Sequence, residues 1–320
     1  MIGVQKIVLV TGGAGFIGSH LTDKLSEGGY EVIVIDDFSG GTKKNLKSDP
    51  EIIRTAAGDP MVAEKLTGLE GGKISAAFHL ATNTNIDSSL EKTTQQSAAE
   101  ISNTLNFVQL CVTFGITRFV FASATHVYGP SISPLVTEND VGVPVNAYGT
   151  AKLACEHFLH NIELMSGGDI VTRSFFPISL RFANVYGPRQ NATGEAGAIA
   201  DICRSMVEGK PPVLYGNGKQ AGDFIYIADA VSALVAAMNN RITGTCNISS
   251  ASAVQSAAIY KSLKRTSKCE LHPQYLPFPD VRQADGRYDN SKAAKILSWA
   301  PTINLKLGLA STFAWFEKSN

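Results

Sequence analysis

The chain has 320 residues, 44% hydrophobic and 18% charged, and its 28 basic side chains balance its 28 acidic ones. This length can bury a large core, as one large domain or two interleaved ones. The neutral balance argues against a nucleic-acid or membrane surface, and no apolar run is long enough to span a bilayer. We therefore expect no nucleic acid and no membrane among its partners. No secretory signal precedes the first strand, so we expect a cytoplasmic protein.

The five cysteines are scattered through the chain: Cys111, Cys155, Cys203, Cys246 and Cys269. The absence of CxxC spacing is typical of small buried thiols in a reducing compartment, and it favours neither a disulfide framework nor a metal site. Asp223 and Asp229 also lack the spacing of oxygen ligands. We expect these two carboxylates to cap or fix a helix rather than to bind a metal.

Residues 6–18, KIVLVTGGAGFIG, join a short β-branched strand to a glycine-rich turn and the start of a helix. Gly12, Gly15 and Gly18 lie three apart, which brings backbone N–H groups close to a pyrophosphate at the helix N-terminus. A Cβ at these positions would block that approach or disturb the packing of helix on strand. With a strand before it and a helix after it, the turn predicts a dinucleotide-binding site.

An acidic residue follows at a suitable distance. A second strand, YEVIVID, ends at Asp36, 24 residues after Gly12. A carboxylate there can accept both hydroxyls of an adenosine ribose. Asp37 adds a second negative charge, and the two together would repel a 2′-phosphate. The sequence therefore predicts NAD rather than NADP as cofactor, with the polar loop DFSGGTKKNL beside the adenosine.

Further along the chain, short apolar runs alternate with segments of helical period. Strands are predicted at residues 51–59, 74–81, 118–124 and 177–188, and helices at 90–115 and 147–164. This alternation predicts a Rossmann-type α/β fold, a doubly wound parallel sheet with ligands at the carboxyl ends of its strands.

The alternation loosens after Gly187, which suggests a change of domain. We place an NAD-binding domain at residues 1–186 and a smaller C-terminal substrate-binding domain at residues 187–320. The apolar segment 222–240 is expected to pack back onto the first domain, so that the second supplies one wall of a substrate cleft.

Tyr148 and Lys152 lie four apart in YGTAK, near the start of a predicted helix, and therefore share one helical face. A nearby ammonium lowers the pKa of a phenol from its usual ~10 toward neutrality, which would make Tyr148 a general base. Lys152 could also hold the nicotinamide ribose. On a helix surface alone such a pair is usually unremarkable, but here it follows the fifth strand of a dinucleotide-binding fold.

Several motifs occur together and in order: TGGAGFIGSHL, HLA, FVFASATHVYG, YGTAK, RFANVYGPRQ, GNGKQAGDFIYIADA and DNSKAAKIL. Over nearly its whole length the chain thereby resembles the extended short-chain dehydrogenase/reductase family. Within that family it is most similar to the NAD-dependent sugar-nucleotide epimerase/dehydratase branch, near UDP-glucose 4-epimerase. The resemblance implies an epimerase that acts on a UDP-sugar through a 4-keto intermediate. It also implies a homodimer formed by paired helices.

The resemblance assigns roles to individual residues. The pyrophosphate and adenosine contacts fall on Gly12, Gly15, Phe16, Ile17, Gly18, Asp36, Asp37, Phe38, Ser39, Gly40 and Asp59. The middle of the cofactor falls on Leu80 and Ala81, and the nicotinamide half on Tyr148 and Lys152. Asn184 and Arg282 are implied as contacts to the nucleoside diphosphate of the substrate.

One departure concerns the catalytic hydroxyl. The family usually has Ser or Thr three residues before VYG, and this chain has Ala124 there. Its neighbours Ser123 and Thr125 would point to the other face of a regular strand. We predict that Thr125, or failing it Ser123, supplies the hydroxyl donor, with a local irregularity at the strand end. The alternative is a catalytically attenuated enzyme.

Two other departures affect charge. Gly222 stands where the family commonly has an arginine for the diphosphate, which leaves Arg282 or Arg287 to carry that charge. Glu100 replaces an asparagine near the nicotinamide half. We expect the carboxylate of Glu100 to face solvent, with an electrostatic role in the site as the alternative.

Neighbouring residues limit the choice of activity. Related dehydratases and decarboxylases have Asp-Glu or Ser-Glu directly before VYG, whereas this chain has Thr125 and His126, so these activities are less favoured. His126 could touch the substrate or be structural, and His79 is expected to be a buried, backbone-bonded histidine. The remaining alternatives are an NAD-dependent dehydrogenase or reductase of a small substrate and an NAD-binding protein without turnover.

Overall fold

The structure is a computed structural model that describes residues 6–70, 73–82, 90–130, 133–165, 175–191, 197–239, 241–277 and 286–319. Within these residues, a seven-stranded parallel sheet has the order β10-β6-β5-β4-β1-β2-β3. Its strands are β1 (Ile7–Thr11), β2 (Glu31–Ile35), β3 (Glu51–Ile53), β4 (Ile74–His79), β5 (Arg118–Ala124), β6 (Phe176–Phe182) and β10 (Gly244–Ile248). The chain reverses its direction of winding between β1 and β4, and this switch point is where such sheets bind ligands.

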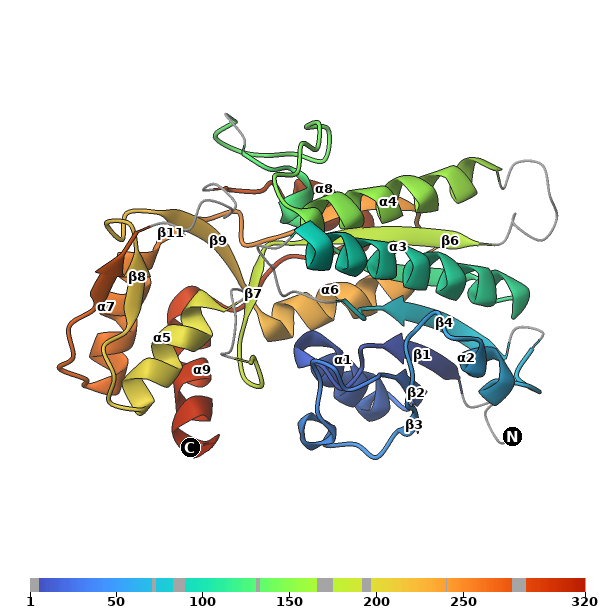
Figure 1. Cartoon of the computed structure of the whole chain (residues 1–320), viewed down its shortest axis with the longest axis horizontal. Helices are drawn as coiled ribbons and strands as arrows, with labels where there is room; N and C mark the ends of the chain where they lie inside the picture. The colour runs from blue at the N-terminus through green and yellow to red at the C-terminus, as the bar shows by residue number, and fades with distance from the viewer. Residues whose placement is uncertain are drawn as a thin grey trace.

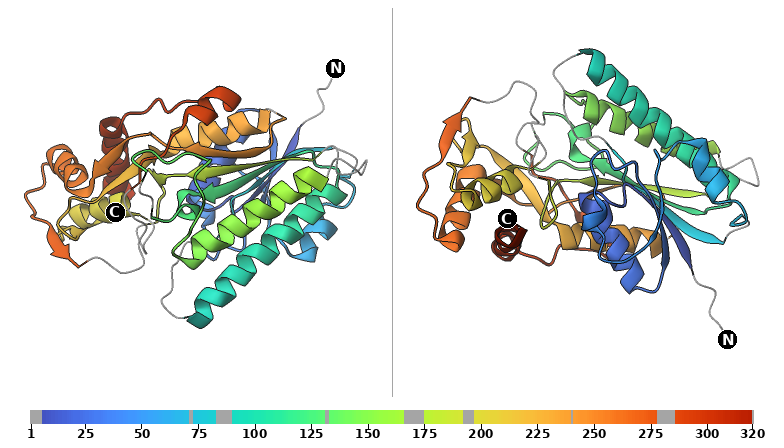
Figure 2. Two further views of the ribbon diagram at one scale, coloured as in Figure 1. Left: turned by 90° about the horizontal axis from the view of Figure 1, so that it is seen from above. Right: turned by 60° about the horizontal axis from the view of Figure 1, so that its bottom comes forward.

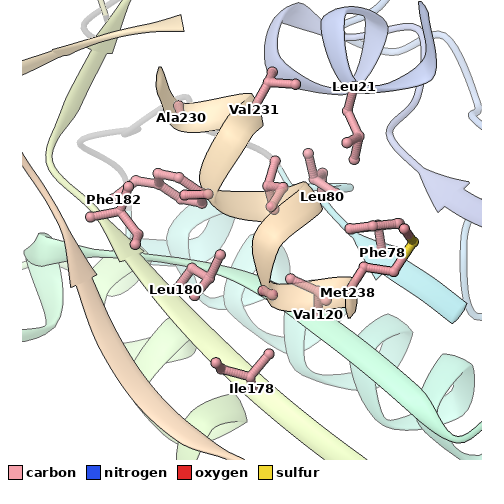
Figure 3. Packing of buried hydrophobic residues seen from close by; sticks show 14 of the residues in the cluster. Leu21, Phe78, Leu80, Val120, Ile178, Leu180, Phe182, Ala230, Val231 and Met238 are labelled. Atoms are coloured by element: carbon pink, nitrogen blue, oxygen red, sulfur yellow. The ribbon is translucent and has the colours of Figure 1, made fainter. Parts of the chain in front are cut away.

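Helices cover both faces of this sheet (Figures 1 and 2). One face carries α1 (Phe16–Glu27), α6 (Ile227–Asn239) and α8 (Ser291–Leu297), and the other carries α2 (Pro60–Lys65), α3 (Leu90–Thr113) and α4 (Ala147–Met165). Successive strand residues point to opposite faces, so Val8 and Val10 join the first layer while Leu9 joins the second. Figure 3 shows the first layer, where Met238 of α6 lies beside Phe78 of β4 and Val231 of α6 faces Leu21 of α1. The predicted Rossmann-type α/β fold is confirmed.

The smaller part of the molecule lies beyond the end of β6 (Figure 1). It contains the strands β7 (Asn184–Tyr186), β9 (Ala221–Tyr226) and β11 (Ala253–Gln255) in one sheet, and β8 (Val213–Tyr215) and β12 (Gln274–Leu276) in another. Helices α5 (Ala198–Val207), α7 (Ser256–Ser267) and α9 (Leu305–Ser319) enclose a core of their own with these strands. The predicted strand 177–188 is in fact divided at Ala183 between the two sheets.

The segment that returns to the first domain is longer than predicted. Within 222–240, β9 pairs in the small sheet, and α6 packs on the large one together with Ile225 of β9. The return continues through β10, which pairs with β6 at the sheet edge, and Trp299 after α8 is also buried there. The chain first leaves the large sheet at Ala183, and the two parts are interleaved after it. The predicted domain division at residue 187 stays a prediction.

Buried polar contacts hold these parts together. The Asp23 carboxylate on α1 accepts a hydrogen bond from Arg189, just after β7, at 2.7 Å. Asp229 accepts hydrogen bonds from Thr302 and from the N–H of Ile303, and so fixes the segment before α9. Among the described residues, no helix is long and apolar enough to cross a membrane. In the same residues, no cluster of three or more His, Cys, Asp or Glu side chains could hold a metal ion.

Candidate active site

The glycine-rich turn after β1 is closely packed and leaves no room for side chains. Gly12 has a φ of +66°, and a Cβ there would lie 2.7 Å from the amide nitrogen of Ala81. A Cβ on Gly18 would lie 2.0 Å from the Gly12 carbonyl oxygen. Gly15 caps α1, which has no side-chain cap and no acidic residue in its first turn. The N–H groups of Phe16 and Ile17 at this positive helix end therefore suit an anionic pyrophosphate.

Asp36 lies at the end of β2, beside this turn. It is 6% exposed, and its two oxygens accept the backbone N–H groups of Ala14 and Phe38, each at 2.8 Å. Burial raises the pKa of the Asp36 carboxyl, although these two N–H groups act in the opposite direction. Each oxygen keeps a second lone pair, so the carboxylate is fixed in position and can still accept ribose hydroxyls.

The loop after Asp36 folds back onto the glycine turn. Asp37 accepts the N–H and the hydroxyl of Ser39, at 2.8 and 2.6 Å, in a tight exposed turn that continues to Gly40. Thr42 then donates its N–H to the Ala14 carbonyl. Phe38 adopts a left-handed φ of 61° and its ring lies under the Arg54 guanidinium. The loop thus stands where the sequence predicts the adenosine.

Asp59 lies six residues after β3, since that strand ends earlier than predicted. Its carboxylate accepts the N–H of Met61 and caps α2. Its predicted contact to adenine stays a prediction.

A hydrogen-bonded chain connects the turn after β4 to α3. The hydroxyl of Thr11 accepts the N–H groups of Leu80 and Ala81, at 3.2 and 3.1 Å, and lies 2.8 Å from Nδ1 of His79. Since the Thr11 hydroxyl oxygen already accepts two N–H groups, we infer that its own O–H donates to Nδ1 of His79. Nε2 of His79 then donates to Thr104, which donates in turn to the Glu100 carbonyl oxygen at 2.8 Å.

His79 is therefore buried, as predicted, but it is bonded to hydroxyls rather than to the backbone. Burial lowers the pKa of His79 to about 3, so the ring is neutral, as this hydrogen-bond pattern requires. The sequence gives no direct sign of this series of hydrogen bonds, because its residues come from three separate elements, β1, β4 and α3. The series fixes the backbone of Leu80 and Ala81, the predicted contacts to the middle of the cofactor.

Tyr148 and Lys152 share one face of α4, as their spacing predicts. The Lys152 ammonium lies 5.7 Å from the centre of the Tyr148 ring and 4.7 Å from that of Phe121, and its side chain is fully buried. Burial raises the pKa of Tyr148 above its usual value; Lys152 opposes this rise and Glu100 adds to it. The prediction that the pKa of Tyr148 falls toward neutrality is therefore wrong for the protein without ligands.

Burial of the phenol is the largest cause of this rise, and Glu100, which was expected to face solvent, adds to it. Its carboxylate is instead 10% exposed and lies 2.8 Å from the Lys152 ammonium. Although burial opposes the charge of each group, their mutual attraction outweighs it, so the pKa of Glu100 is lowered and that of Lys152 is raised. The alternative expectation, an electrostatic role in the site, fits this position.

The end of β5 stays regular where an irregularity was expected. Ala124 is still paired with Phe182 of β6, and the chain turns only at Thr125, the first residue of a 3-10 turn, η2 (Thr125–Val127). Thr125 is 2% exposed and has left strand geometry. Ser123 donates its hydroxyl to Glu156 at 2.5 Å, and Glu156 is paired with Arg181. Ser123 is thus engaged in a buried ion pair and does not fit the predicted donor role, while Thr125 remains a candidate.

His126 lies directly beside the catalytic pair. Its ring meets that of Tyr148 edge to face, with centroids 5.4 Å apart. Burial lowers the pKa of His126 to about 4, so the imidazole is neutral. Within the described part of the chain, its buried Nδ1 has no hydrogen-bond partner. This placement favours a contact in the site, one of the two interpretations of His126 that its sequence left open.

The predicted diphosphate contacts lie at the start of the smaller part. Asn184 is exposed on β7 and donates its amide to the Asp223 carbonyl oxygen at 2.8 Å. A Cβ on Gly222 would lie 3.3 Å from that amide nitrogen, so the position without an arginine is next to Asn184. Arg287 is exposed, and its Nε donates to the Ala251 carbonyl oxygen. Arg282 lies outside the described residues.

Together these features define a class of protein, a dinucleotide-dependent enzyme of the short-chain dehydrogenase/reductase type. The roles of Tyr148 and Lys152 as its catalytic pair stay a prediction. The residues fit NAD, because the helix after the glycine turn starts without a side-chain cap or an acidic residue, and Asp36 is positioned for a ribose without a 2′-phosphate.

Comparisons with known proteins are more specific. The model of the NAD dependent epimerase/dehydratase family matches residues 8–249. UDP-glucose 4-epimerase of Mycolicibacterium smegmatis is 30% identical over 323 residues, 98% of this chain and 99% of that protein. UDP-glucuronic acid decarboxylase 1 of Xenopus tropicalis is 29% identical over 335 residues, 98% of this chain and 73% of that protein. The crystal structure of UDP-glucose 4-epimerase with UDP-glucose from Thermotoga maritima has a TM-score of 0.89 at 31% identity, covering 98% of this chain and 99% of that one.

The chain belongs to the NAD-dependent epimerase/dehydratase family. The predicted class of enzyme and its NAD cofactor are thereby confirmed. The relatives include both epimerases and decarboxylases, so family membership alone leaves the reaction open.

Proposed function

We propose that the chain is a UDP-sugar 4-epimerase of the UDP-glucose/UDP-galactose type that acts through a 4-keto intermediate. One observation carries the choice among family activities: the residue at position 126 contacts Tyr148, and it is a histidine. The resemblance implies a carboxylate there in dehydratases and decarboxylases, for their later proton transfers. Thr125 and His126 supply none, so the chemistry is expected to stay at one carbon of the sugar.

The roles follow from the geometry of the catalytic pair. When bound, NAD supplies a reversible hydride acceptor at its nicotinamide ring. Tyr148, as phenolate, takes the proton of the sugar 4-hydroxyl and returns it once the keto group is reduced from its other face. Lys152 provides a buried positive charge that favours the phenolate and can hold ribose hydroxyls. No net oxidation results, so reduced cofactor does not accumulate.

Asn184 supports a nucleoside diphosphate as the other half of the substrate. It is exposed where the chain leaves the large sheet, and a neutral amide can bind a phosphate oxygen or a base edge. Arg287 adds a positive charge nearby in the fold, through its hydrogen bond to the loop that precedes β11. Because Gly222 replaces an arginine, we expect the diphosphate to bind more weakly. This expectation would also suit the alternative function, a dehydrogenase of a small substrate.

A second copy of the chain is part of the proposal. Helices α3 and α4 pack side by side on one face of the sheet (Figure 2), and Phe158 of α4 remains 39% exposed. A homodimer formed by these helices would cover that ring. Light scattering should then give twice the chain mass of 34.0 kDa.

The experiment incubates the protein with NAD and either UDP-glucose or UDP-galactose, and follows the sugar by NMR and the cofactor by absorbance. An epimerase interconverts the two sugars without a rise in reduced-nicotinamide absorbance. A rise in that absorbance indicates a dehydrogenase, and loss of carbon dioxide from UDP-glucuronic acid indicates a decarboxylase. A protein that binds NAD but changes no substrate is the attenuated alternative. The Tyr148→Phe variant is the blank for contaminating activity.

A further inference from the structure

The catalytic pair has a third charged member that its spacing in the sequence does not reveal. We infer that Glu100 is a positioning residue: its carboxylate holds the Lys152 ammonium beside the Tyr148 ring and offsets part of its positive charge, which adds to the effect of burial in disfavouring the Tyr148 phenolate. This inference deepens the proposed function, because it assigns a control of proton transfer to the same site.

Geometry supports a fixed arrangement. The carboxylate reaches Lys152 from the neighbouring helix α3, at 2.8 Å, and both side chains are almost or fully buried. The ring of Phe121 covers the ammonium at 4.7 Å. The backbone of Glu100 is fixed as well, because its carbonyl oxygen accepts the hydroxyl of Thr104 at the end of the chain through His79. Glu100 is thus held at two points, its carboxylate by Lys152 and its backbone carbonyl by Thr104.

The other titratable groups around Tyr148 and Lys152 are neutral. His79 on β4 and His126 on η2 have a lowered pKa because both are buried. Cys155 on α4 has a raised pKa for the same reason. The nearby Glu156 is already paired with Arg181. Glu100 and Lys152 therefore dominate the field at the phenol, and together they carry no net charge.

An unpaired ammonium would favour the phenolate strongly, since charges interact over several ångströms in a buried site. A carboxylate in contact with that ammonium opposes this effect, because it repels the phenolate, although the ammonium keeps the larger influence of the two. Thr82 interacts with both Glu100 and Tyr148, so the carboxylate and the phenol share a neighbour. An asparagine, the residue that the family resemblance implies at position 100, would have no such effect.

The test measures the ionisation of Tyr148 without substrate. Phenolate absorbance is titrated against pH and the titration of the Tyr148→Phe variant is subtracted. In the wild-type protein the Tyr148 midpoint should lie above ~10. In Glu100→Gln, which removes the charge at nearly equal volume, the midpoint should fall by about one pH unit, which gives about tenfold more phenolate at a given lower pH. Glu91→Gln, an exposed carboxylate on the same helix, should leave it unchanged.

Two further variants distinguish charge from structure. Glu100→Asp keeps the charge and should keep the midpoint close to that of the wild type. Glu100→Asn should behave as Glu100→Gln, and it replaces that variant if Glu100→Gln does not fold. A wild-type midpoint near neutral pH, or a folded Glu100→Gln with an unchanged midpoint, overturns the inference. The titration needs no turnover, so it stands or falls separately from the proposed UDP-sugar epimerase.

Discussion

The two ends of the ligand-binding edge of the large sheet use different chemistry. At β1 and β2, the geometry of the backbone prepares the site: Gly12 and Gly18 admit no Cβ, and N–H groups fix Asp36. Around β5, α3 and α4, buried side-chain charges prepare the site, above all the pair of Glu100 on α3 and Lys152 on α4. Changes at the first end should therefore act through fit and be nearly independent of pH. Changes at the second should act through protonation and alter the pH profile.

The largest effect is expected at the second end. Tyr148→Phe deletes the proposed base and only one oxygen atom, so turnover of the best UDP-sugar should fall by ~10³-fold or more. NAD affinity should stay within about threefold of the wild type, because the glycine turn is untouched. Steady-state kinetics and an NAD titration measure the two effects. Substantial remaining turnover would mean that another group, with His126 the nearest, is the base.

The next largest effect is expected at the first end, in the glycine turn after β1. A Cβ at Gly18 would lie 2.0 Å from the Gly12 carbonyl oxygen, whereas one at Gly15 would lie 3.1 Å from the same atom. Gly18→Ala should therefore weaken NAD binding by ~100-fold and destabilise the fold by about 2 kcal/mol, and Gly15→Ala should do both to a smaller extent. Calorimetry and thermal unfolding measure this. Equal effects of the two substitutions would argue against a steric origin.

The first end was also the easier one to predict from sequence. A strand, a spaced glycine turn and a following acidic residue are local patterns, and they predicted the close packing at Gly12 and Gly18 and the position of Asp36 beside them. The cofactor contacts of these residues stay predictions. The strand 118–124 was predicted with its observed bounds, because both ends of a short buried apolar run can be recognised in the sequence. Local patterns of this kind carry their own geometry, so one stretch of sequence is enough.

The second end depends on contacts between distant elements, so the sequence predicted the shared face of Tyr148 and Lys152 but not the position of Glu100. Whether Glu100 faces solvent or Lys152 depends on how α3 packs on α4. The helical period of the sequence does not determine this for a residue at the edge of the apolar face. Ser123 was a reasonable candidate until Glu156, on α4, was found to accept its hydroxyl. The interleaving after residue 187 arises from β10 pairing with β6, again a long-range contact.

An effect of similar size on turnover, without the loss of stability, concerns the missing hydroxyl at Ala124. If Thr125 has taken over the donor role from its turn after β5, Thr125→Val should lower turnover by ~10²-fold while Ala124→Ser leaves it nearly unchanged. NAD affinity should be normal in both variants, since neither residue belongs to the glycine turn. Should Ala124→Ser accelerate turnover and Thr125→Val have no effect, the enzyme simply lacks the donor and is attenuated.

The smallest effect sharpens the comparison at the first end, where one charge is superimposed on the backbone geometry. Asp36→Asn should reduce the preference for NAD over NADP by about tenfold, because it removes the negative charge that opposes a 2′-phosphate. NAD itself should also bind less tightly, because asparagine has one accepting oxygen and an NH₂ donor, whereas Asp36 accepts the Ala14 and Phe38 N–H groups on two separate oxygens. Asp37→Asn is the matched variant: Asp37 is exposed and occupied by Ser39, so solvent screens its charge and its effect should be weaker. Titration of both cofactors against both variants decides the matter. An unchanged preference in Asp36→Asn would show that the shape of the loop after β2, rather than the charge of Asp36, excludes NADP.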